Sequence, residues 1–374
     1  MALIVSSQVQ AQEPQPVYSI VKEVNEFSWY ETQSELWKAE IDKNDQNAEA
    51  WYYYYAANRA MKNLQEDNEK RKLHEVKCRE IADEAIKTIP ETFEGNHLYY
   101  WDRGFDSGES EYLFMAHEIA PQDSRAFADL LIYFELKRES VKQMEMAKLM
   151  FKENLLPSIL LNWGYNVLAE LDENAIVFTG GDNDTYALWL VQGALGFRQD
   201  VTVMNTYMMT DTDYRKLMLE ELEMGSLEIK PDEDAFNTMF QYVFDNSKER
   251  SVYVAMSCAH QFQKEEIKKN LYLNGLTYKY SITEFDNTSV IRRNYEKRYL
   301  IDYLKQEFST VEFRTHLGKN LNGMYLASMI KLYKTYKIAE ENDEAAELKK
   351  LIDKIAGVTG QIEEIEKLLK ASGC

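Results

Sequence analysis

Two closely spaced carboxylates in the middle of the chain are the strongest candidates for chemistry. They belong to Asp182-Asn183-Asp184-Thr185, which follows the Gly180-Gly181 pair. Carboxylate, amide and hydroxyl oxygens are the ligands that a hard divalent cation such as Ca²⁺, Mg²⁺ or Mn²⁺ prefers. A helix that starts here would instead offer free N–H groups to an anion. The simpler interpretation is structural, because the glycines permit a turn and Asp184 or Thr185 can cap a helix. We prefer capping, and ligand binding by Asp182, Asn183, Asp184 and Thr185 stays the alternative.

A cysteine and a histidine two positions apart form a second candidate site. They lie in Ser257-Cys258-Ala259-His260, directly after a predicted strand. A Cys–His pair can act as a nucleophile and its base, but no orienting Asn or Asp can be assigned, and a free cysteine commonly packs as a small apolar residue. The five histidines have no HExxH spacing, and the chain has no glycine loop of the Walker or Rossmann kind. We therefore expect no cofactor and favour a protein that is not an enzyme, with a divalent cation only as the alternative.

Dense aromatic runs mark a third candidate site. The chain has 25 Tyr and 6 Trp, and they gather in Trp51-Tyr52-Tyr53-Tyr54-Tyr55 and in Tyr99-Tyr100-Trp101. In a helix, Trp51 and Tyr55 share a face while Tyr53 points away, so these rings cannot all be core. They would either line a groove for a peptide or glycan or fill the gaps between helices, and we prefer gap filling. The groove hypothesis assigns the binding surface to Trp51, Tyr52, Tyr55, Tyr99 and Trp101.

The elements that carry these aromatic residues have a helical pattern. Apolar residues recur three or four positions apart from Val17 to about Leu160 and predict helices over 29–41, 48–64, 73–89, 109–119 and 124–151. The joints at 37–51 and 116–128 each read as a helix, a short polar turn and a second helix with an aromatic residue near its start. This plan resembles degenerate tetratricopeptide repeats, in which small Ala residues allow close helix contact.

From Asn174 onward the hydrophobic period changes. Short apolar runs predict strands at 175–179, 201–205, 251–256 and 277–282, with helices at 186–195 and 232–244. A strand, a tight loop, a helix and a strand within about 30 residues make a βαβ unit, so we predict a parallel sheet covered by helices. Helices return at 322–341, 344–355 and 361–369. The predicted fold is therefore α/β plus all-α, with a helical domain at 17–160, an α/β domain at 161–317 and a helical segment at 318–374.

Several of these segments together resemble one known family. The residues that carry the resemblance are Asn174 to Asn205 with its Gly-Asp-Asn-Asp-Thr loop, Asn246 to Ala255, Leu273 to Tyr278 and the helices after Gly318. They are similar to the soluble C-terminal region of a bacterial membrane-protein family of unknown function, whose membrane half resembles protein O-mannosyltransferases. The resemblance implies the α/β fold and an exposed loop. Transferase chemistry does not carry over, because this chain lacks those membrane helices and has Ala187 and Ser251 where the family usually has Pro.

Charge and the first residues indicate where the protein acts. The net charge is −20, which disfavours nucleic acid or an anionic membrane surface as the main partner. No apolar run is long enough to span a membrane. Val9-Gln10-Ala11 is typical of the end of a secretory signal, so residues 1–16 are interpreted as a signal-peptide remnant or a disordered N-terminus. We expect a periplasmic or extracellular protein of the cell envelope that binds a protein or a glycan. The alternative is a metal-assisted, glycan-processing or nucleotide-sugar-handling domain centred on the Gly-Asp-Asn-Asp-Thr loop.

Overall fold

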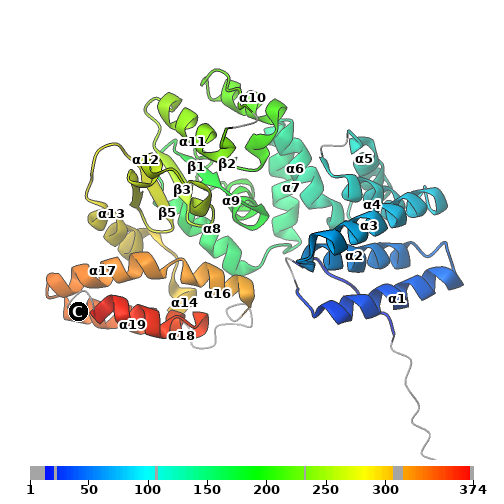
Figure 1. Cartoon of the computed structure of the whole chain (residues 1–374). Helices are drawn as coiled ribbons and strands as arrows, with labels where there is room; N and C mark the ends of the chain where they lie inside the picture. Colours follow the sequence, from blue (N-terminus) through cyan, green and yellow to red (C-terminus); the bar gives the residue numbers. More distant parts are fainter. Residues whose placement is uncertain (1–12, 21–22, 106–107, 231–232, 306–314, 371–374) are drawn as a thin grey trace, which may run out of the picture. The chain divides into compact units, whose positions relative to one another are not determined.

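The chain divides into two compact units, Met1–Leu130 and Leu131–Cys374. The computed structural model describes residues 13–20, 23–105, 108–230, 233–305 and 315–370 (Figure 1). The signal-like residues 9–11 lie outside these ranges. The predicted boundary between residues 160 and 161 lies inside helix α8 (Ser158–Glu170). Within the described ranges, no helix combines the length and the apolarity needed to cross a bilayer.

The first unit is a succession of helices, each packed against the next along the chain. Helix α2 also contacts α4, so these two helices share a layer. Side chains of Asn47, Asp67 and Thr92 cap the starts of α2, α3 and α4 by accepting hydrogen bonds from backbone N–H groups. The bounds are α1 Phe27–Lys43, α2 Ala48–Leu64, α3 Asn68–Thr88, α4 Phe93–Arg103 and α5 Ser110–Ile119.

The single helix predicted over 124–151 is wrong. The structure has a 3-10 turn at Ser124–Ala126, then α6 (Phe127–Leu136) and α7 (Ser140–Lys152). The chain breaks at Arg138, whose φ is 53°. The N–H groups of Arg138 and Glu139 donate to the carbonyls of Glu135, at 2.9 Å, and Phe134, at 2.8 Å, which is the pattern of a helix that ends in a left-handed residue. The guanidinium pairs with the buried Glu135 and with Glu221 on α10 (Thr212–Glu221).

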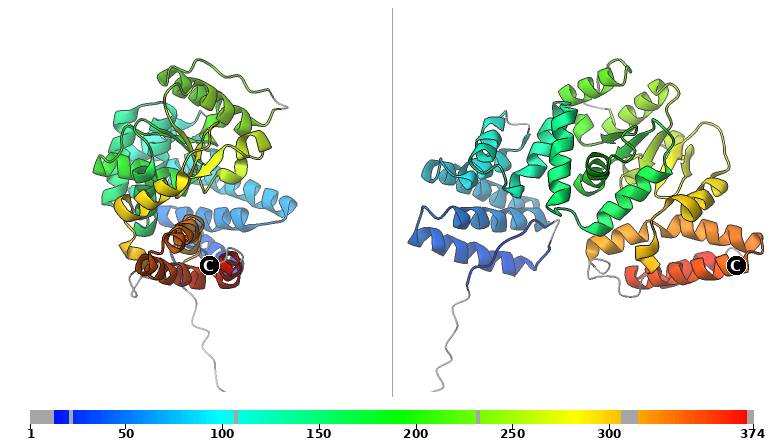
Figure 2. Two further views of the ribbon diagram at one scale, coloured as in Figure 1. Left: turned by 90° about the vertical axis from the view of Figure 1, so that its left-hand side faces the viewer. Right: turned by 180° about the vertical axis from the view of Figure 1, so that it is seen from behind.

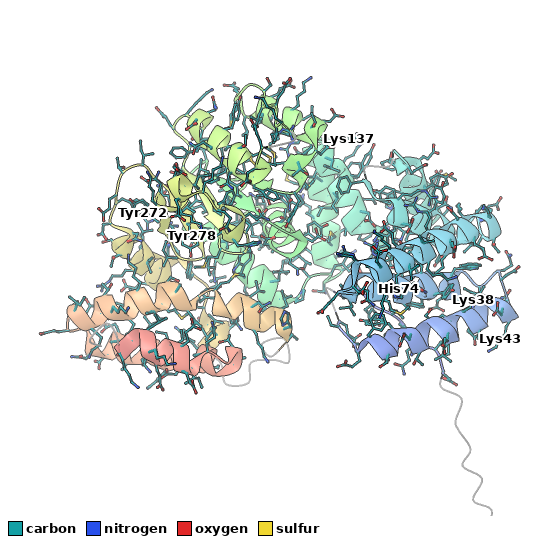
Figure 3. All side chains as sticks on the ribbon, in the orientation of Figure 1. Lys38, Lys43, His74, Lys137, Tyr272 and Tyr278 are labelled. Atoms are coloured by element: carbon teal, nitrogen blue, oxygen red, sulfur yellow. The ribbon has the colours of Figure 1, made fainter. Side chains whose placement is uncertain are left out.

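A five-stranded sheet lies at the centre of the second unit, in the order β2-β1-β3-β5-β4. The prediction of a parallel sheet is confirmed for β2, β1 and β3, but β5 and β4 add antiparallel to β3, so the sheet is mixed. Strand β4, which carries Tyr272, was not predicted, and it pairs with β5, which carries Tyr278 (Figure 3). The bounds are β1 Ile176–Thr179, β2 Thr202–Asn205, β3 Val252–Ala255, β4 Leu271–Leu273 and β5 Thr277–Tyr280.

Helices cover the two faces of this sheet. Phe178 contacts Phe240 of α11 (Ala235–Asn246), whereas the next side chain, Thr179, meets Thr185 of α9 (Asp182–Leu195). Successive side chains of a strand point to opposite faces, so α11 and α9 pack on opposite sides. This follows from right-handed crossovers that move from β1 to β2 and then back to β3.

The C-terminal part of the second unit is helical, and α17 and α18 run side by side (Figures 1 and 2). The helix predicted over 322–341 is in fact two helices, with the break at Met324 and Tyr325. A π-helical turn at Asn294–Arg298 extends α13. The bounds are α12 Glu265–Lys268, α13 Asn287–Arg293, α14 Asp302–Lys305, α16 His316–Gly323, α17 Leu326–Ile338, α18 Asn342–Thr359 and α19 Ile362–Lys370.

A buried carboxyl group joins three of these elements. Glu170, at the end of α8, accepts hydrogen bonds from the backbone N–H of Leu276 at 3.0 Å and from the hydroxyls of Thr277 and Tyr299. Its side chain is 1% exposed, and burial raises its pKa to about 7 although these hydrogen bonds oppose the shift. The glycine of the β4–β5 turn, Gly275, has φ of 153° and lies against this carboxyl group.

We predict that Gly275→Ala destabilises the protein severely, because the new Cβ would overlap Glu170 Oε2 and the Tyr299 hydroxyl. The loss should exceed about 3 kcal/mol, since backbone strain and overpacking add. Gly196→Ala is the control: its φ is also positive, but no atom lies within 4 Å of the new Cβ, so it should cost only about 1 kcal/mol. Chemical denaturation measures the free energy of unfolding of both variants. Equal losses of stability would contradict the close packing of Gly275 against Glu170 and Tyr299.

We also predict that Glu170 gives the protein a specific pH dependence. Its pKa is raised from 4.5 to about 7, so its contribution to stability is full below about pH 4.5 and is lost as the pH rises through 7. Denaturation curves between pH 5 and 8 should therefore show stability falling more steeply in the wild type than in Glu170→Gln.

Asp172→Asn serves as the control for this pH series. Burial raises the pKa of Asp172, but hydrogen bonds from Lys279, Ser251 and Tyr253 outweigh that effect and hold the pKa at about 2. Its contribution is present above pH 3.8 and is lost only in stronger acid, so this variant should keep the wild-type slope between pH 5 and 8. A wild-type slope in Glu170→Gln would refute the assignment.

Candidate functional site

The predicted Asp182–Thr185 loop lies at the carboxyl ends of the parallel strands, but it is not a loop. Helix α9 begins at Asp182, so these four residues form its first turn. Asp184 is buried, and its carboxylate accepts hydrogen bonds from the backbone N–H groups of Gly180 at 2.8 Å and Gly181 at 2.7 Å. The hydroxyl of Ser257, beyond β3, donates to the same carboxylate at 2.5 Å. The Asp184 carboxylate therefore caps the backbone N–H groups of the two residues before α9, as the third residue of a capping box does.

Thr185 connects α9 to two strands. Its hydroxyl lies 2.7 Å from that of Thr179 on β1 and accepts a hydrogen bond from Asn205 Nδ2 on β2 at 2.8 Å. All three side chains are buried. Thr185 therefore has an internal role, and of the four predicted ligands only Asp182 is exposed, with Asn183 half-buried. In the part of the chain that the structure describes, no three His, Cys, Asp or Glu side chains are grouped so as to hold a metal ion.

The Cys258–His260 pair is separated by burial. Cys258 is fully buried, its thiol donates weakly to the Phe178 carbonyl at 3.3 Å, and burial raises its pKa well above the ordinary value. His260 is exposed. A neutral, inaccessible thiol is a poor nucleophile, so the packing interpretation of Cys258 fits this geometry. A glycine is needed at position 180, because a Cβ atom there would overlap Cys258.

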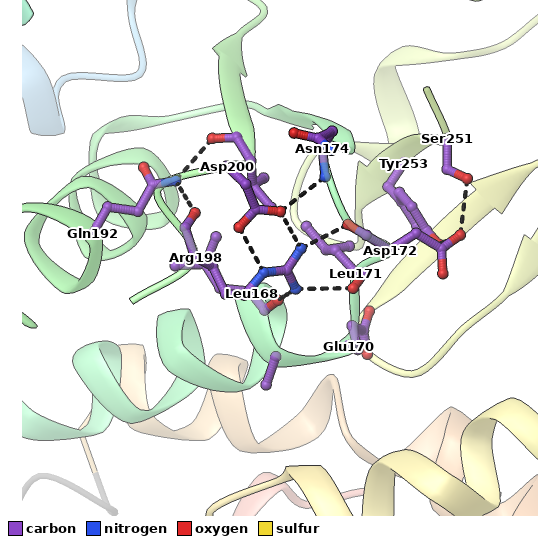
Figure 4. A network of polar contacts seen from close by, with 12 residues as sticks. Leu168, Glu170, Leu171, Asp172, Asn174, Gln192, Arg198, Asp200, Ser251 and Tyr253 are labelled. Carbon is purple, nitrogen blue, oxygen red and sulfur yellow. Dashed lines mark hydrogen bonds and ion pairs between the residues drawn. The ribbon is translucent and has the colours of Figure 1, made fainter. Parts of the chain in front are cut away.

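At the opposite end of the strands, Arg198 organises a polar network that the sequence did not reveal (Figure 4). Its guanidinium donates to the backbone carbonyls of Leu168, Leu171 and Asp172 at 2.6–2.9 Å and pairs with Asp200. These bonds satisfy carbonyls at the end of α8, which has no glycine cap. The pKa of Asp200 is held at about 2, chiefly by Arg198. The network is structural, because its polar groups hydrogen-bond to one another and join the end of α8 to Arg198 and Asp200.

The five predicted groove residues do not form one surface. Trp51 and Tyr55 are buried in the core of the first unit, and Trp51 Nε1 donates to the Asp45 carbonyl at 2.8 Å. Tyr99 packs with Tyr112 on a different face of α4 from Trp101, and the Arg103 guanidinium lies 3.3 Å from the centre of its ring. Trp101 brings together two of the others: its ring stacks on Tyr52, with ring centres 6.0 Å apart, and lies 5.6 Å from that of the buried Tyr55 at a tilt of 43°.

Tyr52 and Trp101 belong to a larger set, which we call the aromatic–arginine cluster and define as Tyr52, Arg59, Phe93, His97, Trp101 and Arg125. His97 stacks between Phe93 and Trp101, at 5.0 and 5.6 Å, because the three residues lie four apart on α4. Arg125 lies 4.5 Å from the centre of the Tyr52 ring, and Arg59 lies 4.3 Å from that of Trp101. Such cation–π contacts are worth about 0.5–2 kcal/mol each.

Acidic side chains hold Arg125 and His97 of this cluster in place. Arg125 pairs with Asp123 at 2.5 Å and with Glu94 at 2.7 Å, and His97 Nε2 lies 2.8 Å from Asp129 Oδ2. Glu94 and Asp129 lie on other elements than their partners, so no local spacing connects them. The local signals are the i, i+4 spacing of Phe93, His97 and Trp101 and the placing of Asp123 two positions before Arg125.

Residues 160–238 match the family model described as TMEM260-associated domain 2. The matched segment runs from α8 into α11 and therefore contains Glu170, Arg198 and the Asp184 helix start. The match fits the coarser part of the sequence resemblance, a TMEM260-like family for this segment. The chain has no match among the curated proteins.

We predict that Asp184→Asn and Asp182→Asn have unequal effects. Asp184→Asn should cost about 2 kcal/mol, because an amide cannot accept all three hydrogen bonds and places an NH₂ group near backbone donors. Asp182→Asn should cost less than about 1 kcal/mol at the exposed first turn. Thermal denaturation with and without Ca²⁺, Mg²⁺ or Mn²⁺ measures this. A cation-dependent rise in Tm that both variants abolish would instead support the metal site.

Proposed function

We propose that this chain is a non-catalytic interaction module of the cell envelope, and that its first unit binds a protein partner through the aromatic–arginine cluster. The observation that carries the proposal is the gathering of half-buried Tyr52, Trp101, Arg59 and Arg125 from α2, α4 and the turn before α6. Tyr, Trp and Arg are the residues most enriched where proteins bind one another.

The covering of the rings favours a protein over a glycan as the partner. Sugars bind aromatic residues by packing on an open ring face, whereas Tyr52 and Trp101 stack on each other and have guanidinium groups above them. The exposed parts of these half-buried rings and guanidinium groups suit the mixed polar and apolar surface of a protein.

Two further parts of the proposal come from the sequence. The alternation of helices in the first unit, with α2 and α4 in one layer, supports a degenerate tetratricopeptide-like arrangement. Export to the periplasm or the outside is supported by Val9-Gln10-Ala11 and by the resemblance to the extramembrane region of a membrane-protein family. The alternative of metal-assisted glycan processing draws no support from the Asp184 helix start, because that carboxylate is already engaged by Gly180, Gly181 and Ser257.

The proposal is tested with Trp101→Ala. A partner captured from an envelope extract is identified and purified, and its affinity for the wild type and the variant is measured by calorimetry. Loss of a central tryptophan should weaken binding about 30-fold, which corresponds to about 2 kcal/mol.

Tyr272→Ala, which removes a half-buried ring from β4 in the second unit, is the control and should bind like the wild type. Circular dichroism and Tm show that both variants are folded. Unchanged affinity in folded Trp101→Ala would overturn the proposal.

A further inference from the structure

The second unit has a surface groove away from the sites described above. It has a volume of about 630 Å³ and lies between α11, α12 and the segment that follows α10. Its apolar lining is Leu227, Tyr242 and Ile267. Its polar lining is Asn237, Thr238, Gln241, Asp245, Lys264 and Glu266.

One wall of the groove is an extended segment, residues 225–230, which belongs to no helix or strand. Its exposure alternates as in a strand, with Ser226, Glu228 and Lys230 exposed and Leu227 and Ile229 half-buried. The Tyr242 hydroxyl fixes the start of the segment by hydrogen bonding to the carbonyls of Met224, at 2.7 Å, and Ser226, at 3.0 Å. The segment is therefore held straight against α11 without being part of the sheet.

The backbone of this segment is only partly paired: the carbonyls of Ser226 and Leu227 accept from Tyr242 and Arg215, and the Lys230 N–H donates to Glu233. Among the described residues, the N–H groups of residues 226–229 and the carbonyls of Glu228 and Ile229 make no hydrogen bond. An extended chain with free N–H and C=O groups is a template on which a second extended chain can pair, and adjacent pockets then select alternate side chains.

The charge of the groove indicates which peptide would fit. Three carboxylates, those of Glu228, Asp245 and Glu266, lie on the segment and the groove, and within the described ranges none of them forms an ion pair. Lys264 on the lining and the exposed Lys230 on the segment are the cations among these described residues, so the carboxylates outnumber them by three to two. The surplus of negative charge, on a protein of net charge −20, favours a ligand with Lys or Arg side chains.

We infer that this groove binds an extended basic peptide segment of a partner protein, which pairs with residues 226–229 and places alternate apolar side chains against Leu227, Tyr242 and Ile267. This goes beyond the proposed function, because it concerns a different unit and a different surface. Apolar contacts would supply affinity, and the acidic rim would supply the preference for basic residues.

The test measures fluorescence anisotropy of labelled peptides with the full-length protein. A peptide of alternating Lys and Val should bind with a Kd below about 1 mM, and the matched peptide of Glu and Val should bind at least 10-fold more weakly. N-methylation of alternate residues along one edge of the Lys–Val peptide should abolish binding, because it removes the backbone donors.

Charge reversal in the protein completes the test. Asp245→Lys should lower the affinity for the Lys–Val peptide about 10-fold. Glu347→Lys, an equal change of charge at an exposed position on α18, should leave this affinity unchanged. Equal effects of the two variants, undiminished binding of the N-methylated peptide, or no binding at all would overturn the inference. The aromatic–arginine cluster takes no part in this assay. A failure of the groove inference can therefore be distinguished from a failure of the proposed function.

Discussion

Burial of the Glu170 carboxyl group is the constraint on which the second unit depends. A carboxyl group that is 1% exposed must have hydrogen-bonding partners, and they come from parts of the chain more than 100 residues away. The partners belong to the β4–β5 turn and the π-helical turn, which must both reach the end of α8. Nearby, Asn166 of α8 bonds the backbone of Leu300 and the hydroxyl of Tyr325, so the C-terminal helices are tied to the same helix. The antiparallel strands and these helices are thus fixed around α8 by polar contacts as much as by apolar packing.

Buried polar groups must be hydrogen-bonded in the first turn of α9 as well. This turn resembles a ligand-binding site, but the side chains of Asp184 and Thr185 already bond within the fold. Parallel strands end together at this edge, where Asp184, Thr185 and Asn205 meet, and ligands commonly bind at such edges. Here Asp184, Thr185 and Asn205 hydrogen-bond within the fold, and the Asp184 carboxylate accepts from the backbone N–H groups of Gly180 and Gly181. The surfaces that we propose for binding lie elsewhere, in the aromatic–arginine cluster of the first unit and the α11–α12 groove of the second.

Local patterns in the sequence predicted most elements but few of their partners. Helix α2 was predicted at its observed bounds, and β1, β2, β3 and β5 within two residues, because their apolar periods are clear. Strand β4 was missed because three half-buried residues give too short a pattern, and the antiparallel addition of β5 depends on pairing that no local spacing encodes. The break at Arg138 was missed because a left-handed residue at a helix end is usually Gly or Asn, and here it is Arg. Among the site residues, Asp184 and Thr185 were found by the glycines before them, whereas Glu170 has only distant partners. Arg198 and Arg125 each pair with an aspartate two positions away, but their other partners lie on distant elements.

The most direct test of the central claim is the titration of Glu170 followed by ¹³C NMR of its side-chain carboxyl carbon, assigned with the Glu170→Gln variant. A carboxyl group enclosed by α8, the β4–β5 turn and the π-helical turn should titrate near pH 7. A midpoint near 4.5, the value of an exposed glutamate, would mean that water reaches this group and that the junction does not exist in solution.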